Sequence, residues 1–234
     1  MAVNPRSSAF ISGFDGKARV VDMKAYWDKR YRDEGRIWGD SPSTTAAYAL
    51  ELFRRHNVET VLIPGAGYGR NSKLFSASDF EVTGVEISGV ACGLAKEYDP
   101  HSKFCHGSAL DMSFDDNLYD AVYCYNVLHL FRERERRLFL DECDGKLRNG
   151  GLLFFTVFSD REPSFGKCEE VEEGTFESKP GRPVHYFTEE ELRNHFSRFE
   201  TLEAGIAEDP EDHGEGPHTH ILRYIFARKS SKVI

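Results

Sequence analysis

The chain has 234 residues, 40% of them apolar and 29% charged, which is typical of one soluble globular domain. Its formal net charge of −9 opposes binding to nucleic acid backbones and anionic membranes, so neither is expected as a partner. No apolar run approaches the ~20 residues of a membrane span. The five cysteines form no C-x-x-C pair, which argues against a disulfide framework and predicts a reducing, cytoplasmic location.

The chain begins with a segment that has no basic-then-apolar signal pattern, and we expect residues 1–21 to be a partly disordered lead-in. Apolar residues at helical spacing then predict an early capping helix over 22–34, which ends at Gly35. A second helix is expected from a cap at Ser43 to about His56.

Strands and helices are then expected to alternate. The apolar runs predict strands at 60–64, 80–86, 103–106, 119–125 and 152–158. Helices are predicted at 68–77, 88–98 and 133–147, the last of them ended by Asn149-Gly150-Gly151. Such alternation is typical of a parallel sheet with helices on both faces.

The last third of the chain departs from this alternation. Residues 160–186 are rich in Glu, Gly and Pro and are predicted to be a lid insertion. After a short helix at 188–196, two strands at 199–206 and 221–227 are separated by a polar loop at 208–220. The whole order predicts an α/β fold over 22–234, a doubly wound, mostly parallel seven-stranded sheet with an antiparallel last strand.

A glycine turn followed by an acid is the most informative pattern. Residues Val61–Asn71 read V-L-I-P-G-A-G-Y-G-R-N, and the next apolar run ends at Glu86, whose carboxylate can accept hydrogen bonds from both hydroxyls of a ribose. A dinucleotide fingerprint requires glycine where this chain has Arg70. The pattern therefore favours S-adenosylmethionine, which has no phosphate and needs only close backbone approach at Gly65 and Gly67, over an ordinary strand-turn-helix.

Further motifs follow this pair. They are H-G-S-A-L-D-M-S-F from His106, Y-D-A-V-Y-C-Y-N-V-L-H-L-F from Tyr119 and L-R-N-G-G-L-L-F-F from Leu147. Over residues 26–229 the chain resembles the class I S-adenosylmethionine-dependent methyltransferases. The resemblance implies a Rossmann-like methyltransferase fold with S-adenosylmethionine as cofactor. It implies cofactor contacts at Gly65, Ala66, Gly67, Glu86, Ile87, Ser108, Ala109 and Asn126, with Trp27 and Arg30 closing over the cofactor from the early helix.

Within that family the chain is most similar to the thiopurine, thiol/halide and tellurite-resistance methyltransferases. The similarity rests on Pro64 before the glycines, on V-T-G-V-E-I-S and on Y-W-D-K-R-Y…I-W-G-D-S-P. It implies a small-molecule acceptor with a soft nucleophile. Two positions depart from the wider family, because Ile63 and Pro64 stand where many members carry an acid, and Ser108 stands where many have Asp. Contact to the adenine amine would then come from Ser108, from Asp111 or through water.

Methyl transfer from a sulfonium is an in-line displacement that needs alignment more than acid-base help. His129, His218 and His220 are the candidate catalytic residues, and His129 can equally be a structural imidazole. The stretch 213–220 holds three imidazoles near carboxylates, which can be read as a zinc site, a substrate contact or a solvated turn. We expect no metal there, because the spacing is loose. The acidic run at 169–173 is a solvated surface or one wall of the site.

Three other functions remain open at this stage. They are a nicotinamide-dependent oxidoreductase, a protein or other O- or N-methyltransferase of the same fold, and a cofactor-binding protein without turnover. The sequence carries no signal for an oligomeric state.

Overall fold

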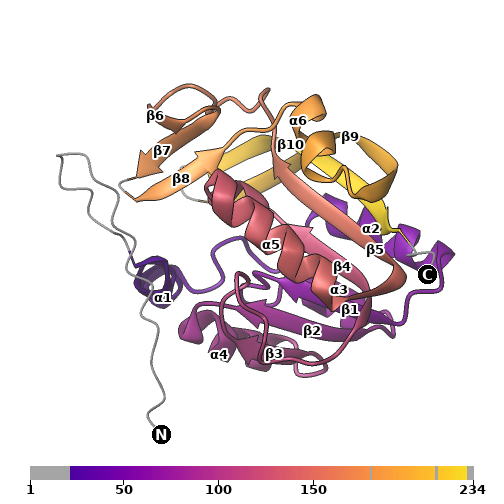
Figure 1. Ribbon diagram of the computed structural model, residues 1–234. Helices are drawn as coiled ribbons and strands as arrows, with labels where there is room; N and C mark the ends of the chain where they lie inside the picture. Colours follow the sequence, from indigo (N-terminus) through magenta and orange to yellow (C-terminus); the bar gives the residue numbers. More distant parts are fainter. Residues whose placement is uncertain (1–21, 180, 214–215, 231–234) are drawn as a thin grey trace, which may run out of the picture.

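The fold is built on one seven-stranded sheet, seen in a computed structural model that describes residues 22–179, 181–213 and 216–230. The strand order is β3-β2-β1-β4-β5-β10-β9, which confirms the predicted α/β architecture (Figure 1). The predicted lead-in at 1–21 lies outside the described residues. No helix of the described ranges is long and apolar enough to cross a membrane.

Five strands of this sheet are parallel. They are β1 (Thr60–Pro64), β2 (Glu81–Glu86), β3 (Lys103–His106), β4 (Tyr119–Tyr125) and β5 (Leu147–Phe158). The order reverses between β1 and β4, so a crevice is expected at the carboxyl ends of these two strands. One boundary was predicted wrongly, because Asn149-Gly150-Gly151 lies inside β5 and does not end the preceding helix.

The last two strands form a long hairpin. The chain's last strand, β10 (Gly216–Lys229), runs antiparallel to both β5 and β9 (Phe199–His213), as predicted. The predicted polar loop at 208–220 was wrong, because its described residues continue the two strands. Pro210 and its acidic neighbours are disfavoured in strands, so no pattern in the sequence indicated this pairing. Both are tolerated here because β9 is the edge of the sheet.

Helices cover both faces of the sheet (Figure 1). They are α1 (Met23–Glu34), α2 (Thr44–Arg55), α3 (Ser72–Ser76), α4 (Gly89–Tyr98), α5 (Glu133–Lys146) and α6 (Glu189–His195), with a 3₁₀ turn η1 (Leu128–Leu130). The side chains of Asp22, Ser43, Ser88 and Thr188 accept hydrogen bonds from first-turn N–H groups and so fix four helix starts. The third helix is shorter than the predicted range of 68–77.

Successive side chains of the central strands point to opposite faces of the sheet, so the protein has two hydrophobic cores. Leu62 belongs to one core with Phe139 of α5 and with Phe196, which directly follows α6. Its neighbours Val61 and Ile63 pack on the opposite face with α2 and α3. The described part of the sheet is thus buried on both faces, and a site is expected at its carboxyl edge.

The insertion at 160–186 carries a small antiparallel sheet of β6 (Glu169–Glu172), β7 (Thr175–Lys179) and β8 (Arg182–His185). It packs on the main body through Phe176, Val184 and Tyr186, which contact Leu130 and Phe158. Arg182 Nη1 donates to the hydroxyl of Tyr26 at 3.2 Å, so the small sheet meets α1 above the strand ends (Figure 1). Its action as a lid remains a prediction.

Candidate active site

A cavity of about 870 Å³ lies at the carboxyl ends of the parallel strands. Its walls come from α1, from the turns after β1, β2 and β4, from β8 and from the tip of the β9–β10 hairpin. Every residue predicted to bind the cofactor lines it, namely Trp27, Arg30, Gly65, Ala66, Gly67, Glu86, Ile87, Ser108, Ala109 and Asn126. The structure thus brings these residues together, and their contacts to a cofactor remain predictions.

The carboxylate of Glu86 is the best-defined polar group in the cavity. The residue is 5% exposed, and its Oε2 accepts from the Gly67 N–H at 2.9 Å while Oε1 accepts from the Ser88 N–H at 2.8 Å. Burial raises the pKa of Glu86, and the backbone donors of Ser88 and Gly67 oppose that rise. A carboxylate has about four acceptor positions, so two ribose hydroxyls can still donate to it.

The glycine turn is tight for reasons inside the protein as well. Gly65 and Gly67 have φ of +68° and +57°, which disfavours any residue with a side chain. A Cβ on Gly65 would lie 2.4 Å from Val127 Cγ2, and one on Gly67 would lie 2.9 Å from the hydroxyl of Tyr31. Close approach by a ligand, which the sequence suggested, is therefore only part of the reason for glycine.

The early helix α1 forms one wall of the cavity. The Arg30 guanidinium lies 5.7 Å from the ring centroid of Trp27 and 5.3 Å from that of Trp38, so both rings hold it in place. Asp28 Oδ1 accepts from Ser88 Oγ at 2.7 Å, which fastens α1 to the start of α4. A guanidinium held at the cavity wall in this way can pair with a carboxylate of a bound ligand.

The turn after β4 and the segment after β3 complete this end. Asn126 has φ of +55° and its Oδ1 accepts from Thr156 Oγ1 at 3.1 Å, which orients its amide. Ser108 lines the cavity and accepts from the Leu110 N–H at 3.1 Å. Asp111 is exposed and does not line the cavity, so Ser108 is the better placed of the two predicted base contacts.

His129 combines the two roles that the sequence left open. It lines the cavity, yet it is 3% exposed, stacks on Phe158 at 4.3 Å between centroids and accepts from the Phe158 N–H at Nδ1. Burial, followed by the nearby Arg182 and His220, holds the pKa of His129 well below its usual range. The ring is therefore neutral, and its Nε2 carries the proton.

A charged network forms the opposite end of the cavity. His220 lines it, and His218 lies beside His220 on the same face of β10, as their spacing predicts. Sequence reasoning missed Arg70, Tyr125 and Glu211, which also line this end. Arg70 Nη2 and the Tyr125 hydroxyl both donate to Glu211 Oε1 at 2.9 Å. Only the position of Tyr125 at the end of the fourth predicted strand could have indicated this network.

The acidic run at 169–173 does not face inward. Glu172 accepts from the Glu133 N–H at 3.1 Å and lies 3.4 Å from Arg132 Nη1, at the start of α5. None of the run's residues lines the cavity within the described ranges, whereas Glu177, Lys179 and Arg182 of the same insertion do.

Comparison with known proteins agrees with this geometry. Residues 62–155 match the family model of the methyltransferase domain. A glycine/sarcosine/dimethylglycine N-methyltransferase of Actinopolyspora halophila is 30% identical over 155 residues, which cover 62% of this chain and 24% of that protein. The tRNA N(3)-methylcytidine methyltransferase Mettl2 of Drosophila melanogaster is 31% identical over 143 residues, which cover 56% of this chain and 40% of that protein. The chain thus spans less than half the length of both relatives.

Solved structures share the fold over nearly the whole chain. One described as the conversion of a disulfide bond into a thioacetal group during echinomycin biosynthesis has a TM-score of 0.71 at 17% identity, covering 90% of this chain and 94% of its own. Magnesium protoporphyrin IX methyltransferase of Synechocystis PCC 6803, with bound S-adenosylmethionine, has a TM-score of 0.64 at 15% identity, covering 89% and 95%. Residues 62–155 thus match the methyltransferase domain, and most of the chain shares the fold of S-adenosylmethionine-dependent methyltransferases.

The relatives of this methyltransferase domain act on different acceptors, judging by their names. One is named for amino acids and one for tRNA, so the comparisons do not support the exclusion of nucleic acid that the net charge suggested. The cavity fits S-adenosylmethionine, because an oriented carboxylate, a glycine turn and a held guanidinium all line it.

Proposed function

We propose that this protein transfers the methyl group of S-adenosylmethionine to a small-molecule acceptor with a soft nucleophile, such as a thiol, by in-line displacement. One observation carries the proposal. A single cavity joins the Glu86 end, which suits the adenosine, to the end lined by Tyr125, His129 and His220. An acceptor at that second end faces the position where the methyl group would lie, beside Asn126.

The bound cofactor would supply a methyl group on a positively charged sulfur. The chain's own part is binding and alignment. Glu86 accepts the ribose hydroxyls, and Arg30 pairs with the methionine carboxylate from the α1 wall. Asn126, fixed by Thr156, shapes the passage between the two ends. Such alignment alone can contribute about 7–11 kcal/mol to lowering the barrier.

The soft nucleophile rests on three supports. The subgroup motifs resemble thiopurine, thiol/halide and tellurite-resistance enzymes. The structure with the TM-score of 0.71 is described for chemistry on a disulfide bond. In addition, burial lowers the pKa of His129 and its Nδ1 already accepts from the Phe158 N–H, so the ring is a weak general base. A thiol of pKa ~8.5 needs little help, because a few per cent is already thiolate.

Two measurements test the proposal. Isothermal titration should give heat with S-adenosylmethionine and with its demethylated product, and none with a nicotinamide dinucleotide. Incubation with the radiolabelled cofactor and a panel of thiols, halides, phenols and amines should place label in a soluble product, highest for the thiols. Cofactor binding without product from any acceptor would leave only a binding protein, and heat with the dinucleotide alone would indicate an oxidoreductase.

A macromolecular acceptor is the second candidate, favoured by the tRNA methyltransferase among the relatives. The net charge of −9 opposes it. Label recovered in acid-precipitable tRNA or protein, and absent from the soluble fraction, would establish this alternative. The cytoplasmic location stays a prediction, and fractionation of expressing cells would check it.

A further inference from the structure

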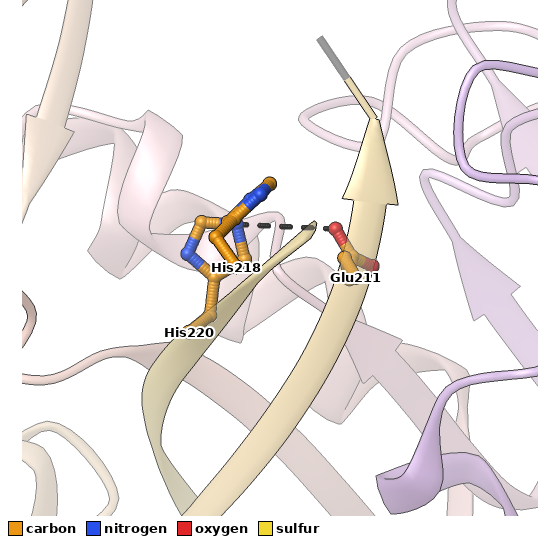
Figure 2. Close-up of side chains that lie close together, drawn as sticks. All are labelled: Glu211, His218 and His220. Carbon is orange, nitrogen blue, oxygen red and sulfur yellow. Dashed lines mark hydrogen bonds and ion pairs between the residues drawn. The ribbon is translucent and has the colours of Figure 1, made fainter. Parts of the chain in front are cut away.

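Three side chains at the tip of the β9–β10 hairpin point toward one another (Figure 2). Glu211 on β9 lies directly across from His218 on β10, and His220 follows on the same face. His218 Nε2 and His220 Nε2 are 3.2 Å apart, and His220 Nε2 is 3.9 Å from Glu211 Oε2. One ligand atom from each residue lies within 4.8 Å of the others.

The hydrogen bonds fix the tautomers of both rings. His218 Nδ1 lies 2.9 Å from the Gly216 carbonyl oxygen, and His220 Nδ1 lies 2.9 Å from Glu162 Oε1. A carbonyl and a carboxylate can only accept, so both Nδ1 atoms carry protons. Two neutral rings would therefore direct two Nε2 lone pairs at each other. This contact is favourable only if a positive charge, a proton or a metal ion, lies between them.

The surroundings are those of a metal site with oriented ligands. A metal-binding histidine usually donates its other ring N–H to a carboxylate or a backbone carbonyl, and both histidines do so here. Glu162 is itself anchored, because its Oε2 accepts from the Ile221 N–H at 2.6 Å. Glu211 Oε1 is held by Arg70 and Tyr125, which leaves Oε2 as the oxygen nearest the rings.

The charge balance also favours a cation. The side chains of Glu162 and Glu211 are each 5% exposed, and Asp209, which accepts from the Tyr125 hydroxyl, is 2% exposed. Among the described residues, Arg70 is paired with Glu211, and His220 faces both Glu162 and Glu211. Buried carboxylates in excess over their cations are costly unless further positive charge joins them.

The loose spacing argued against a metal here, but the hairpin pairing brings Glu211 to the two histidines, and we propose that Glu211, His218 and His220 bind one divalent transition-metal ion of the zinc class. A tetrahedral zinc ion with bonds of ~2.0–2.2 Å places its ligand atoms about 3.3–3.5 Å apart. The separations of 3.2 and 3.9 Å are close to this geometry. Two histidines and one glutamate leave one position open, which is the composition of zinc sites that bind a water or a substrate.

The open coordination position of the metal would be accessible to a ligand in the large cavity. Glu211 and His220 line the large cavity, and Glu211 and His218 also line a neighbouring hollow of about 350 Å³. The metal would thus lie at the end of the cavity away from Glu86, where a sulfur, nitrogen or oxygen donor could bind to it. The metal site itself does not depend on the proposed methyl transfer.

Direct metal titration of the untagged, chelator-treated full-length chain tests the site. We expect one Co²⁺ per chain, with the intense visible absorption of tetrahedral coordination, and displacement of Co²⁺ by Zn²⁺. His218→Gln and His220→Gln should abolish this absorption, and Glu162→Gln should weaken Zn²⁺ binding about 10–100-fold. His101→Ala is the matched control, because this exposed histidine lies outside the cluster and should change nothing.

Circular dichroism and thermal melting of each variant check that the fold is retained. His218→Gln decides the matter if His220→Gln does not fold, because His220 also bonds to Glu162, which helps to hold the insertion. Absence of tetrahedral absorption in the folded wild type, or binding unchanged in both histidine variants, would overturn the proposal. Nitrogen NMR showing that the two rings share a proton and bind no Zn²⁺ would overturn it as well.

Discussion

The two ends of the cavity are built differently. The Glu86 end uses backbone N–H groups and a glycine turn from β1 and β2, which are adjacent in sequence and in the sheet. The opposite end uses polar and charged side chains from the turn after β1, from β4, from the β9–β10 hairpin and from the insertion, and Arg70 and Glu211 there are 141 residues apart. A local motif is thus sufficient to form the first end, whereas the second exists only in the complete fold.

This difference suggests that the Glu86 end serves cofactor binding, which many proteins share, and that the opposite end determines the acceptor. Backbone donors and a carboxylate can hold the same cofactor in many sequences, because they depend little on neighbouring side chains. The network of Arg70, Glu211 and His220 depends on every member, since a buried charge that loses its partner is costly. Changes at the Glu86 end should therefore alter cofactor affinity, and changes at the other end should alter the acceptor.

Replacement of the ribose acid should have the largest effect. We expect Glu86→Ala to weaken binding of S-adenosylmethionine about 10–100-fold, since hydrogen bonds to a charged group are worth about 1.5–3 kcal/mol. Isothermal titration measures the change. Glu81→Ala, at the exposed start of the same strand, is the control and should bind as wild type. Equal affinity of the Glu86 variant would show that the acid does not hold the sugar.

The glycine turn can be tested through stability. Gly65→Ala introduces a Cβ that would lie 2.4 Å from Val127 at a φ of +68°. Gly35→Ala is a matched control, because its φ is +64° and no atom lies within 4 Å of the added Cβ. We expect the control to lose about 1–2 kcal/mol from its free energy of unfolding, and Gly65→Ala to lose about 1–3 kcal/mol more. Denaturant unfolding compares them, and equal losses would mean that Val127 moves aside freely.

The guanidinium on α1 should matter less than the acid. We expect Arg30→Lys to weaken S-adenosylmethionine binding several-fold, because an ammonium cannot form the paired contact to a carboxylate that a guanidinium forms. A cofactor fragment without the methionine part, such as methylthioadenosine, should bind the variant and the wild type equally. A loss of affinity for this fragment as well would place Arg30 elsewhere on the cofactor.

Acid should destabilise the fold through His129. The unfolded residue takes up a proton near pH ~6.5, whereas burial keeps the folded ring neutral at lower pH. The unfolded state then binds more protons, so the free energy of unfolding falls as the pH drops below ~6.5. In His129→Asn this slope should be shallower than in the wild type, as measured by denaturant unfolding across that range. Parallel slopes would show that the ring is protonated in the fold.

Much of the fold could be predicted from the sequence. The bounds of β3 and β4 match the predicted ranges, because short apolar runs flanked by turn residues mark buried strands clearly. The hairpin tip was missed because Pro210 and its acidic neighbours disfavour strands, and only the open side of β9 makes them acceptable. Asn149-Gly150-Gly151 was also misread from its composition. Asn and Gly indicated the end of a helix, but these residues lie within β5.

The residues of the site also fall into those that the sequence predicts and those that it does not. Gly65, Gly67 and Glu86 could be found because their chemistry depends on neighbours in the chain. Arg70 and Glu211 could not, because no local pattern shows that a turn after β1 will meet the edge of the sheet. Their role follows only from strand order, which places β9 and β10 across the cavity from α1.

Ser88 joins two parts of the protein that line different sides of the large cavity. Its N–H positions the carboxylate of Glu86, and its hydroxyl is the anchor for Asp28 on α1. Detachment of the helix would therefore remove a constraint from the very residue that orients the sugar-binding acid. If the cofactor binds as proposed, we expect its entry and release to be coupled to this one hydroxyl, with an exchange rate that depends on how firmly Ser88 holds Asp28.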